Sequence, residues 1–360
     1  MQAEVLRIIE GGLSGDKAKV MNYATSLADN LEREGDARFS KKIRTVIQGK
    51  SNLMATLDGF STRPVDQESR LEIVDVERVM PGDVQLVLSD YIREELSDFV
   101  AAYKKGDVFA SAGMDVPSNL LLYGPPGCGK TSIAHLLAAE TGLPLVTARL
   151  DGLVSSLLGS TAKNIRKVFD YASRQECVLF LDEFDAIAKA RDDANELGEL
   201  KRVVNSLLQN IDSFSDGGIL VAATNHHQLL DPAVWRRFTK TLEVPLPGDT
   251  ELSAYVERFI APLMGEKLKP KAVSALAGLS YSDLEVVTRN AYRSAVIDGG
   301  SKITCYGLVR AAYMARNQGA GDDEEFVSFL LSHGCTIREV TAKTKVSQRR
   351  VQEISKSLRG

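Results

Sequence analysis

Residues 119–131 have the sequence Asn119-Leu120-Leu121-Leu122-Tyr123-Gly124-Pro125-Pro126-Gly127-Cys128-Gly129-Lys130-Thr131. The apolar run before the first glycine indicates a buried strand, and the residues from Lys130 onward indicate a helix. The loop between them matches the pattern G-x-x-x-x-G-K-[ST] at every specified position, from Gly124 to Thr131. The sequence therefore predicts a phosphate-binding loop between a strand and a helix.

Each part of this loop has a chemical role toward a nucleoside triphosphate. The glycines let backbone N–H groups turn toward the phosphates, and the helix N-terminus stabilises the negative charge. Lys130 is predicted to reach the β- and γ-phosphates, and the Thr131 hydroxyl to ligate Mg²⁺. Cys128 is predicted to be a small filler at a variable position. The predicted ATP contacts are Gly124, Pro125, Pro126, Gly127, Cys128, Gly129, Lys130, Thr131 and Ser132.

Two further strands end in polar residues. The apolar run 177–181 is followed by Asp182 and Glu183. Asp182 is predicted to hold Mg²⁺ through water, and Glu183 to act as general base toward the attacking water. The run 218–223 is followed by Thr224 and Asn225, and Asn225 is predicted to orient that water and sense the γ-phosphate. For Asp185 we expect a local salt bridge.

Each of these two strand ends has an ordinary alternative. A strand ending in two acids can be a solvated strand end, and Asn225 can be a turn-forming residue. The order of the three motifs, with the acids about fifty residues after the loop, favours one ATP-hydrolysing site over three unrelated features.

The apolar pattern divides the chain into five parts. Residues 84–247 alternate apolar strands with helices, which predicts an α/β fold with a parallel sheet flanked by helices. Residues 248–318 are predicted to form a helical lid subdomain. Residues 1–57 carry amphipathic helical stripes and are interpreted either as a small bundle or as a docking module, after which 58–83 is a linker. Residues 322–360 form a small C-terminal unit.

Bulk properties exclude several classes of protein. The net charge of −4 over 360 residues does not favour a chain that binds nucleic acid by overall charge. The four cysteines are widely spaced, so we expect reduced thiols and neither a zinc site nor a disulfide framework. We see no signal peptide and no apolar run near the about 20 residues of a membrane span, so we expect a cytoplasmic protein without membrane contact.

These motifs, in this order over about residues 83–317, resemble the AAA family of ATPases. The resemblance implies ATP and Mg²⁺ as cofactors and a ring homo-oligomer, most often a hexamer. Residues 230–238 resemble the family's arginine-finger segment, and the adjacent Arg236 and Arg237 are similar to the spastin, katanin and Vps4 branch. In that family such arginines reach the γ-phosphate bound by a neighbouring subunit. The alternative is two surface arginines.

The same resemblance implies roles for two other places. Residues 279–284 open a lid helix at the place where the family often has Gly-Ala-Asp-Leu, and Ser282 there is a candidate contact to the nucleotide. The substrate-gripping pore loop of the family matches Leu157, Leu158 and Gly159, with Leu157 in place of the usual aromatic residue. A leucine offers less contact area, so remodelling of a protein substrate without processive threading is one expectation, and a core role for the two leucines is the other.

The C-terminal residues resemble a helix-turn-helix. From Thr336 to Gly360 there are seven Lys or Arg against two Glu. Gln348, Arg349 and Arg350 are candidate DNA contacts, whereas a structural or protein-docking unit is the alternative.

The whole architecture also resembles bacterial AAA ATPases found beside a subtilisin-like serine protease in defence or toxin-control systems. We therefore expect an oligomeric ATPase that remodels or regulates a protein partner. A DNA-associated loader or regulator is the alternative.

Overall fold

The structure is a computed structural model that divides into two compact units, Met1–Pro64 and Val65–Gly360. It describes residues 63–65, 72–114, 116, 118–150, 158–174, 176–186, 197–214, 218–317 and 322–358, together with isolated positions between residues 5 and 40. For residues 158–160 and 197–202 the backbone alone is described. The predicted N-terminal helical domain and part of the predicted linker lie outside these ranges. Across the described ranges, no helix combines the length and apolar character that crossing a membrane requires.

Six strands form one sheet in the second unit. Their order across the sheet is β1-β3-β4-β5-β2-β6, and all neighbours are parallel except β1 and β3. The sheet confirms the predicted α/β fold, because the apolar runs at 119–123, 177–181 and 218–223 are three adjacent interior strands of it. The bounds are β1 Asp75–Glu77, β2 Asn119–Tyr123, β3 Leu145–Arg149, β4 Cys177–Asp182, β5 Gly218–Thr224 and β6 Lys240–Glu243.

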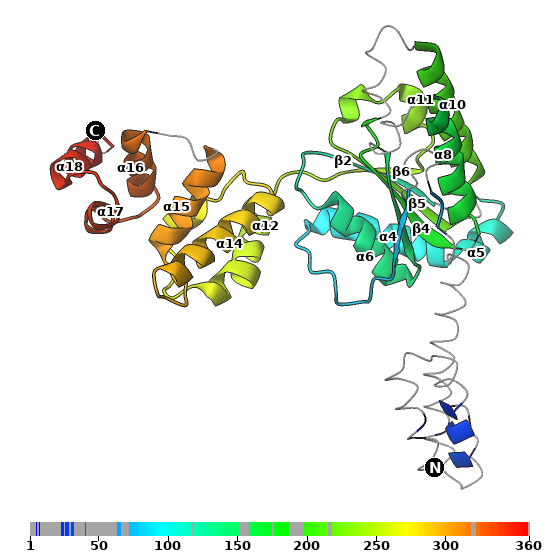
Figure 1. The fold of residues 1–360 in the computed structure, drawn as a ribbon, viewed down its shortest axis with the longest axis horizontal. Coiled ribbons are helices and arrows are strands. Elements are labelled where there is room, and N and C mark those ends of the chain that lie inside the picture. The colour runs from blue at the N-terminus through cyan, green and yellow to red at the C-terminus, as the bar shows by residue number, and fades with distance from the viewer. Residues whose placement is uncertain are drawn as a thin grey trace. The chain divides into compact units, whose positions relative to one another are not determined.

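Helices cover both faces of this sheet, as Figure 1 shows for α4 and α6 on one side and α8 and α10 on the other. One core cluster joins Phe99 of α4 and Leu137 of α6 to Leu120 and Val221 of the strands. All residues of β5, and all of β4 except Asp182, are buried, so both faces of the sheet are covered, which explains why these strands are continuously apolar. The bounds are α4 Asp90–Lys104, α5 Gly106–Ser111, α6 Lys130–Thr141, α8 Leu158–Ala172, α10 Leu197–Ser213, η2 His227–Leu229 and α11 Pro232–Trp235.

Helices follow β6, beginning at Asp249. The longest of them, α14, begins with a capping box in which Ser280 accepts from the Asp283 N–H and Asp283 accepts from the Ser280 N–H. This cap fixes where the helix starts, directly beside the phosphate loop. The bounds are α12 Asp249–Tyr255, the π-helical turn η3 Val256–Ile260, η4 Ala261–Leu263, α13 Pro270–Ser274, α14 Tyr281–Ile297 and α15 Cys305–Arg316.

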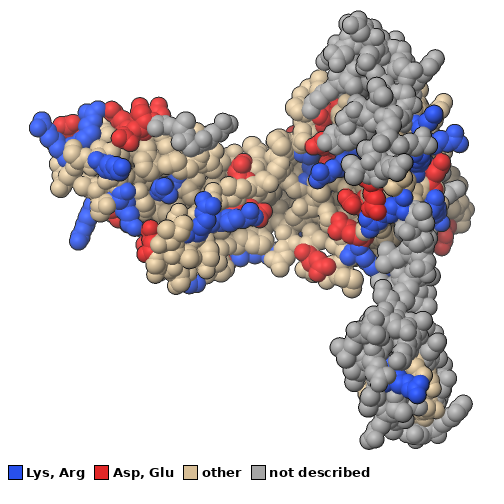
Figure 2. Space-filling model, viewed as in Figure 1, with Lys and Arg blue, Asp and Glu red and all other residues tan. Residues whose placement is uncertain are grey.

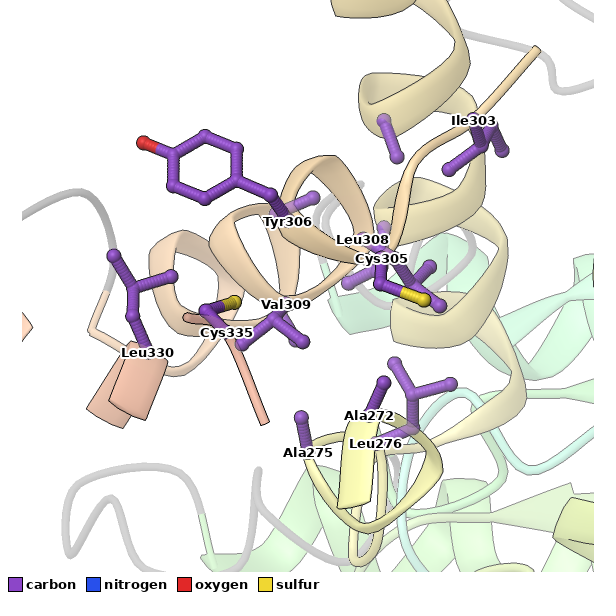
Figure 3. Close-up of a cluster of buried hydrophobic side chains, with 14 of the residues drawn as sticks. Ala272, Ala275, Leu276, Ile303, Cys305, Tyr306, Leu308, Val309, Leu330 and Cys335 are labelled. Carbon is purple, nitrogen blue, oxygen red and sulfur yellow. The ribbon is translucent and has the colours of Figure 1, made fainter. Parts of the chain in front are cut away.

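Three more helices form the C-terminal part: α16 Asp323–Ser332, α17 Ile337–Lys343 and α18 Gln348–Ser357. Their apolar side chains belong to the same buried cluster as those of the lid. Figure 3 shows Ala272 of α13, Val309 of α15 and Leu330 of α16 in this cluster. The C-terminal helices and the lid therefore share one continuous core.

Candidate functional site

The phosphate loop lies at the carboxyl end of β2 and is held from two sides. Gly124, Gly127 and Gly129 have φ of 141°, 73° and 94°, a region that disfavours residues with a Cβ. A Cβ at Gly124 would overlap the backbone carbonyl of Val244, and a Cβ at Gly127 would lie 2.6 Å from Ser280 Oγ. Glycine is therefore needed at both positions for close approach as well as for conformation.

Lys130 and Cys128 lie in this loop with little exposure to solvent. Lys130 Nζ donates to the carbonyl oxygens of Gly124 and Pro125, each at 2.8 Å. Burial lowers the pKa of Lys130, while the nearby Asp182 and Asp185 act in the opposite direction. Burial raises the pKa of the Cys128 thiol. Cys128 is 1% exposed, which agrees with a small side chain that fills space in the loop. Lys130 places a positive charge beside the loop.

Two oxygen ligands suited to Mg²⁺ converge beside the loop. Thr131 Oγ1 lies 3.5 Å from Asp182 Oδ2, so a hydroxyl from the start of α6 faces a carboxylate from the end of β4. Mg²⁺ prefers a few such oxygen ligands completed by phosphate oxygens and water. The residues present therefore fit the predicted ion.

Glu183 has an unusual backbone conformation. Its φ is 52°, and among the described residues it is the sole non-glycine residue with positive φ. Its N–H donates to Asp182 Oδ1 at 2.9 Å, which stabilises this turn. Such strained positions cluster at functional sites. Glu183 and Asn225 line one cavity together with the phosphate loop. This placement is the one required of a base for the attacking water and of a sensor of the γ-phosphate.

Asp185 is a buried anchor for the Asn225 loop. Its Oδ1 accepts from Thr224 Oγ1 at 3.0 Å and from the Asn225 N–H at 3.4 Å. Thr224 Oγ1 in turn accepts from the His226 N–H at 3.0 Å. The loop after β4 therefore holds the loop after β5, a role that the motif patterns did not predict.

Replacing Asp185 with alanine should lower the free energy of unfolding by about 1–3 kcal/mol, because buried donors would lose their acceptor. Urea unfolding measures this loss. The control is Asp170→Ala, which removes an exposed i,i+4 pair with Arg166 and should cost about 0.5 kcal/mol or less. Equal losses for the two variants would contradict the anchoring role.

The cavity has a volume of about 790 Å³ and extends from the phosphate loop to the lid. Residues 85–88 line one side, and aromatic side chains of the lid line another. The π-helical turn after α12 places Tyr255 and Phe259 together, with ring centroids 4.9 Å apart, and Tyr281 lies 5.8 Å from Tyr255. The cavity can therefore hold the flat ring of a ligand against the aromatic lid residues and the polar end of that ligand against the phosphate loop.

Sequence reasoning missed most of this wall. It predicted Ser282, whose N–H donates to the Gly127 carbonyl at 3.1 Å and which lines the cavity. It did not predict the aromatic residues or the residues just before α4, because they carry none of the phosphate-site signals. The only available signals were the i,i+4 spacing of Tyr255 and Phe259 and the apolar run before α4. The missed residues include Leu86, Val87, Leu88, Tyr255, Phe259 and Tyr281.

The structure separates the two adjacent arginines. Arg237 Nε lies 3.1 Å from Asp212 Oδ1, and its Nη1 donates to the Ala233 carbonyl at 3.4 Å. Arg236 is exposed, and within the described ranges its guanidinium has no hydrogen bond or ion pair. It does not line the cavity of its own chain. Arg236 is therefore available to an external ligand, whereas Arg237 is engaged within the chain.

The remaining predicted site residues that the structure describes do not line the cavity. Leu157 is outside the described residues, and Leu158 and Gly159 begin α8 with side chains that are not described. In the C-terminal part, Arg349 pairs with Glu353 at 3.2 Å.

Arg350 is also ion-paired, with Glu324 at 2.5 Å and Glu353 at 3.3 Å. Figure 2 shows acidic and basic side chains side by side over α16 and α18. Gln348 is exposed at the start of α18.

The chain is similar to known ATPases. Residues 120–246 match the model of the ATPase family associated with various cellular activities (AAA). The chain is 43% identical over 235 residues to y4kL of Sinorhizobium fredii, described as an uncharacterized AAA family ATPase, covering 62% of this chain and 68% of that protein. The chain belongs to the AAA family of ATPases and is an ATP-hydrolysing enzyme.

Other relatives are named proteasome-activating nucleotidases. The one from Aeropyrum pernix is 34% identical over 339 residues, covering 89% of this chain and 81% of that protein. One from Saccharolobus islandicus is 32% identical, with 67% and 63% covered, so the match spans less than two thirds of that relative. The crystal structure of the FIGL-1 AAA domain is similar in fold, with a TM-score of 0.55, 23% identity, and coverage of 73% of this chain and 93% of that one. These comparisons do not single out the spastin, katanin and Vps4 branch.

Proposed function

We propose that the protein works as a homo-oligomeric ring, a hexamer as is typical of the family, in which each copy supplies Arg236 to the ATP site of its neighbour. The observation that carries this proposal is the position of Arg236, which is exposed, has no partner in the part of the chain that the structure describes, and lies outside its own cavity. An arginine supplied in trans neutralises charge on the γ-phosphate in the transition state. Hydrolysis then depends on assembly.

Within one site, the residues divide the work by position. ATP would lie with its base against Tyr255 and Tyr281 and its phosphates against the loop, where Lys130 can turn from the loop carbonyls to the phosphates. Mg²⁺, held by Thr131 and Asp182, would offset phosphate charge.

Two residues would act on the attacking water. Glu183 accepts its proton, and Asn225 orients it. The strained backbone of Glu183 supports this role, because the turn directs its side chain into the cavity and away from the line of β4.

The ring acts on a protein partner in this proposal. Support comes from relatives whose name says that they activate the proteasome. A subtilisin-like protease as that partner rests on the resemblance of the architecture alone. A DNA-associated role receives less support, because Arg349 and Arg350 are both ion-paired inside the C-terminal part.

The specific activity of the purified protein should rise with protein concentration, because sites are complete only in the ring. Sedimentation velocity in ATP and Mg²⁺ should show a monomer-to-ring transition over the same concentrations. A specific activity that stays constant across that transition would contradict the shared site.

A further inference from the structure

Arg236 and Arg237 are flanked by two aromatic residues, and each of these packs against an aromatic residue beside a catalytic element. Trp235 contacts Tyr123 with ring centroids 5.3 Å apart and an interplanar angle of 75°. Phe238 contacts Phe184 at 5.8 Å and 81°. Both are edge-to-face contacts, the geometry that aromatic pairs prefer. The arginine segment is therefore held at both of its ends.

The first of these contacts leads to the phosphate loop. Tyr123 is the last residue of β2 and directly precedes Gly124. Its backbone is paired with Thr224 of β5 and Glu243 of β6, and its carbonyl accepts from the Val244 N–H at 2.7 Å. Tyr123 is thus fixed to the strands that carry the loop and Asn225.

The second contact leads to the general base. Phe184 directly follows Glu183 and is 1% exposed. Its N–H donates to the carbonyl of Ala223, at the end of β5, at 2.9 Å. A change in the conformation of the Glu183 turn would therefore move the ring against which Phe238 packs.

A third ring joins the Asn225 loop to the same group. His227, two residues after Asn225, has its ring 5.0 Å from Tyr123 and 6.4 Å from Trp235. The phosphate loop, the Glu183 turn and the Asn225 loop are therefore each close in sequence to an aromatic residue that contacts the arginine segment.

We propose that Tyr123, Phe184 and His227, acting through Trp235 and Phe238, are positioning residues that set the placement of Arg236 according to the nucleotide state of their own chain. This inference rests on the proposed function of Arg236. Packed aromatic contacts are not continuously deformable, so a small shift of the catalytic loops is transmitted to the arginine segment. Each site thereby influences hydrolysis in the next copy of the ring.

Trp235 is the single tryptophan of the chain, so its fluorescence reports on this contact directly. Adding ATP with Mg²⁺ to the wild-type protein should shift the intensity or the emission maximum. The shift should be absent in Lys130→Ala, which is expected not to bind ATP, and reduced in Asn225→Ala. A spectrum that does not change in saturating ATP would overturn the proposal, and this measurement needs no variant that changes the packing.

Trp235→Leu should lower kcat by about tenfold to 10²-fold through misplacement of Arg236, with the KM for ATP little changed. Trp235→Phe keeps a ring at this position and should recover most of the activity. An equal fall for Trp235→Leu and Trp235→Phe would contradict a contact that depends on the ring.

Phe238→Leu has a matched control in Phe214→Leu. Phe214 makes an edge-to-face contact with Phe169 at 5.7 Å and 80°, a pair separate from the Trp235–Tyr123 and Phe238–Phe184 contacts, and is as buried as Phe184. Both variants should lower the free energy of unfolding, but kcat at a temperature where both are folded should fall for Phe238→Leu alone. An equal fall in kcat for Phe238→Leu and Phe214→Leu would mean that Phe238 has a merely structural role.

Mixed rings separate this inference from the proposed function. Glu183→Gln subunits have an intact arginine segment and an inactive site, so mixing them with Arg236→Ala subunits should restore hydrolysis if Arg236 acts in trans. Mixing them with Trp235→Leu subunits should restore hydrolysis in the same way. Recovery with Arg236→Ala but not with Trp235→Leu would overturn the positioning role alone. No recovery with either would overturn the trans site, and the inference with it.

Discussion

Replacing Arg236 with alanine should lower the kcat of ATP hydrolysis by about 10³- to 10⁵-fold, the range known for arginines that stabilise phosphoryl transfer in trans. Binding of ATP should be retained, since Arg236 does not line the cavity of its own chain. The measurement is steady-state hydrolysis at a protein concentration where rings form, with nucleotide affinity measured separately by titration.

Arg237→Ala is the matched control for this prediction. Its guanidinium pairs with Asp212 of α10, and both side chains are partly exposed, so breaking the pair should cost about 1 kcal/mol or less in stability. Its effect on kcat should be far smaller than that of Arg236→Ala. Equal losses for the two variants would mean that the Asp212 pair breaks on assembly, and an unchanged rate for Arg236→Ala would refute the trans role.

Replacing Glu183 with glutamine should lower hydrolysis by about 10²- to 10⁴-fold, because an amide of nearly the same shape cannot accept the proton of the attacking water. ATP should still bind, since the phosphate loop, Lys130 and the magnesium ligands are unchanged. Single-turnover measurements with pre-bound ATP separate this chemical defect from a defect in binding.

Lys130→Ala is the control for the Glu183 variant, because it removes the cation beside the loop carbonyls and should abolish ATP binding itself. In ATP, Glu183→Gln should remain assembled as a ring, whereas Lys130→Ala should stay dissociated in sedimentation. Substantial turnover by Glu183→Gln would exclude Glu183 as the base. Dissociation of an ATP-bound Glu183→Gln protein would contradict assembly driven by the bound nucleotide.

Much of the core fold could be predicted from the sequence because its signals are local. The continuous apolar runs at 119–123, 177–181 and 218–223 became the central parallel strands β2, β4 and β5. The loop from Gly124 to Thr131 has its chemistry in consecutive residues, and Asp182, Glu183 and Asn225 directly follow strands. Parallel strands bring their carboxyl ends to one edge of a sheet, so these motifs converge with no further information.

The C-terminal helices show where local signals stop. Their caps at Asp322, Thr336 and Ser347 form as helix-start signals require. Their burial in the lid core was not predictable, because it depends on which apolar faces meet. Likewise, the basic composition of α18 suggested that its arginine side chains could contact DNA. The fold instead brings Glu324 of α16 against Arg350.

The sequence alone therefore determined the phosphate loop and the α/β core, and it predicted the candidate magnesium ligands and base, since each depends on residues adjacent in the chain or on strand ends that a parallel sheet aligns. Only the tertiary structure decided which of two neighbouring arginines has no partner among the described residues, which rings form the wall of the cavity, and which aromatic contacts hold the arginine segment. Those features depend on contacts between residues far apart in sequence, such as Arg237 with Asp212 and Trp235 with Tyr123. Side-chain packing, which no local pattern encodes, selects these contacts.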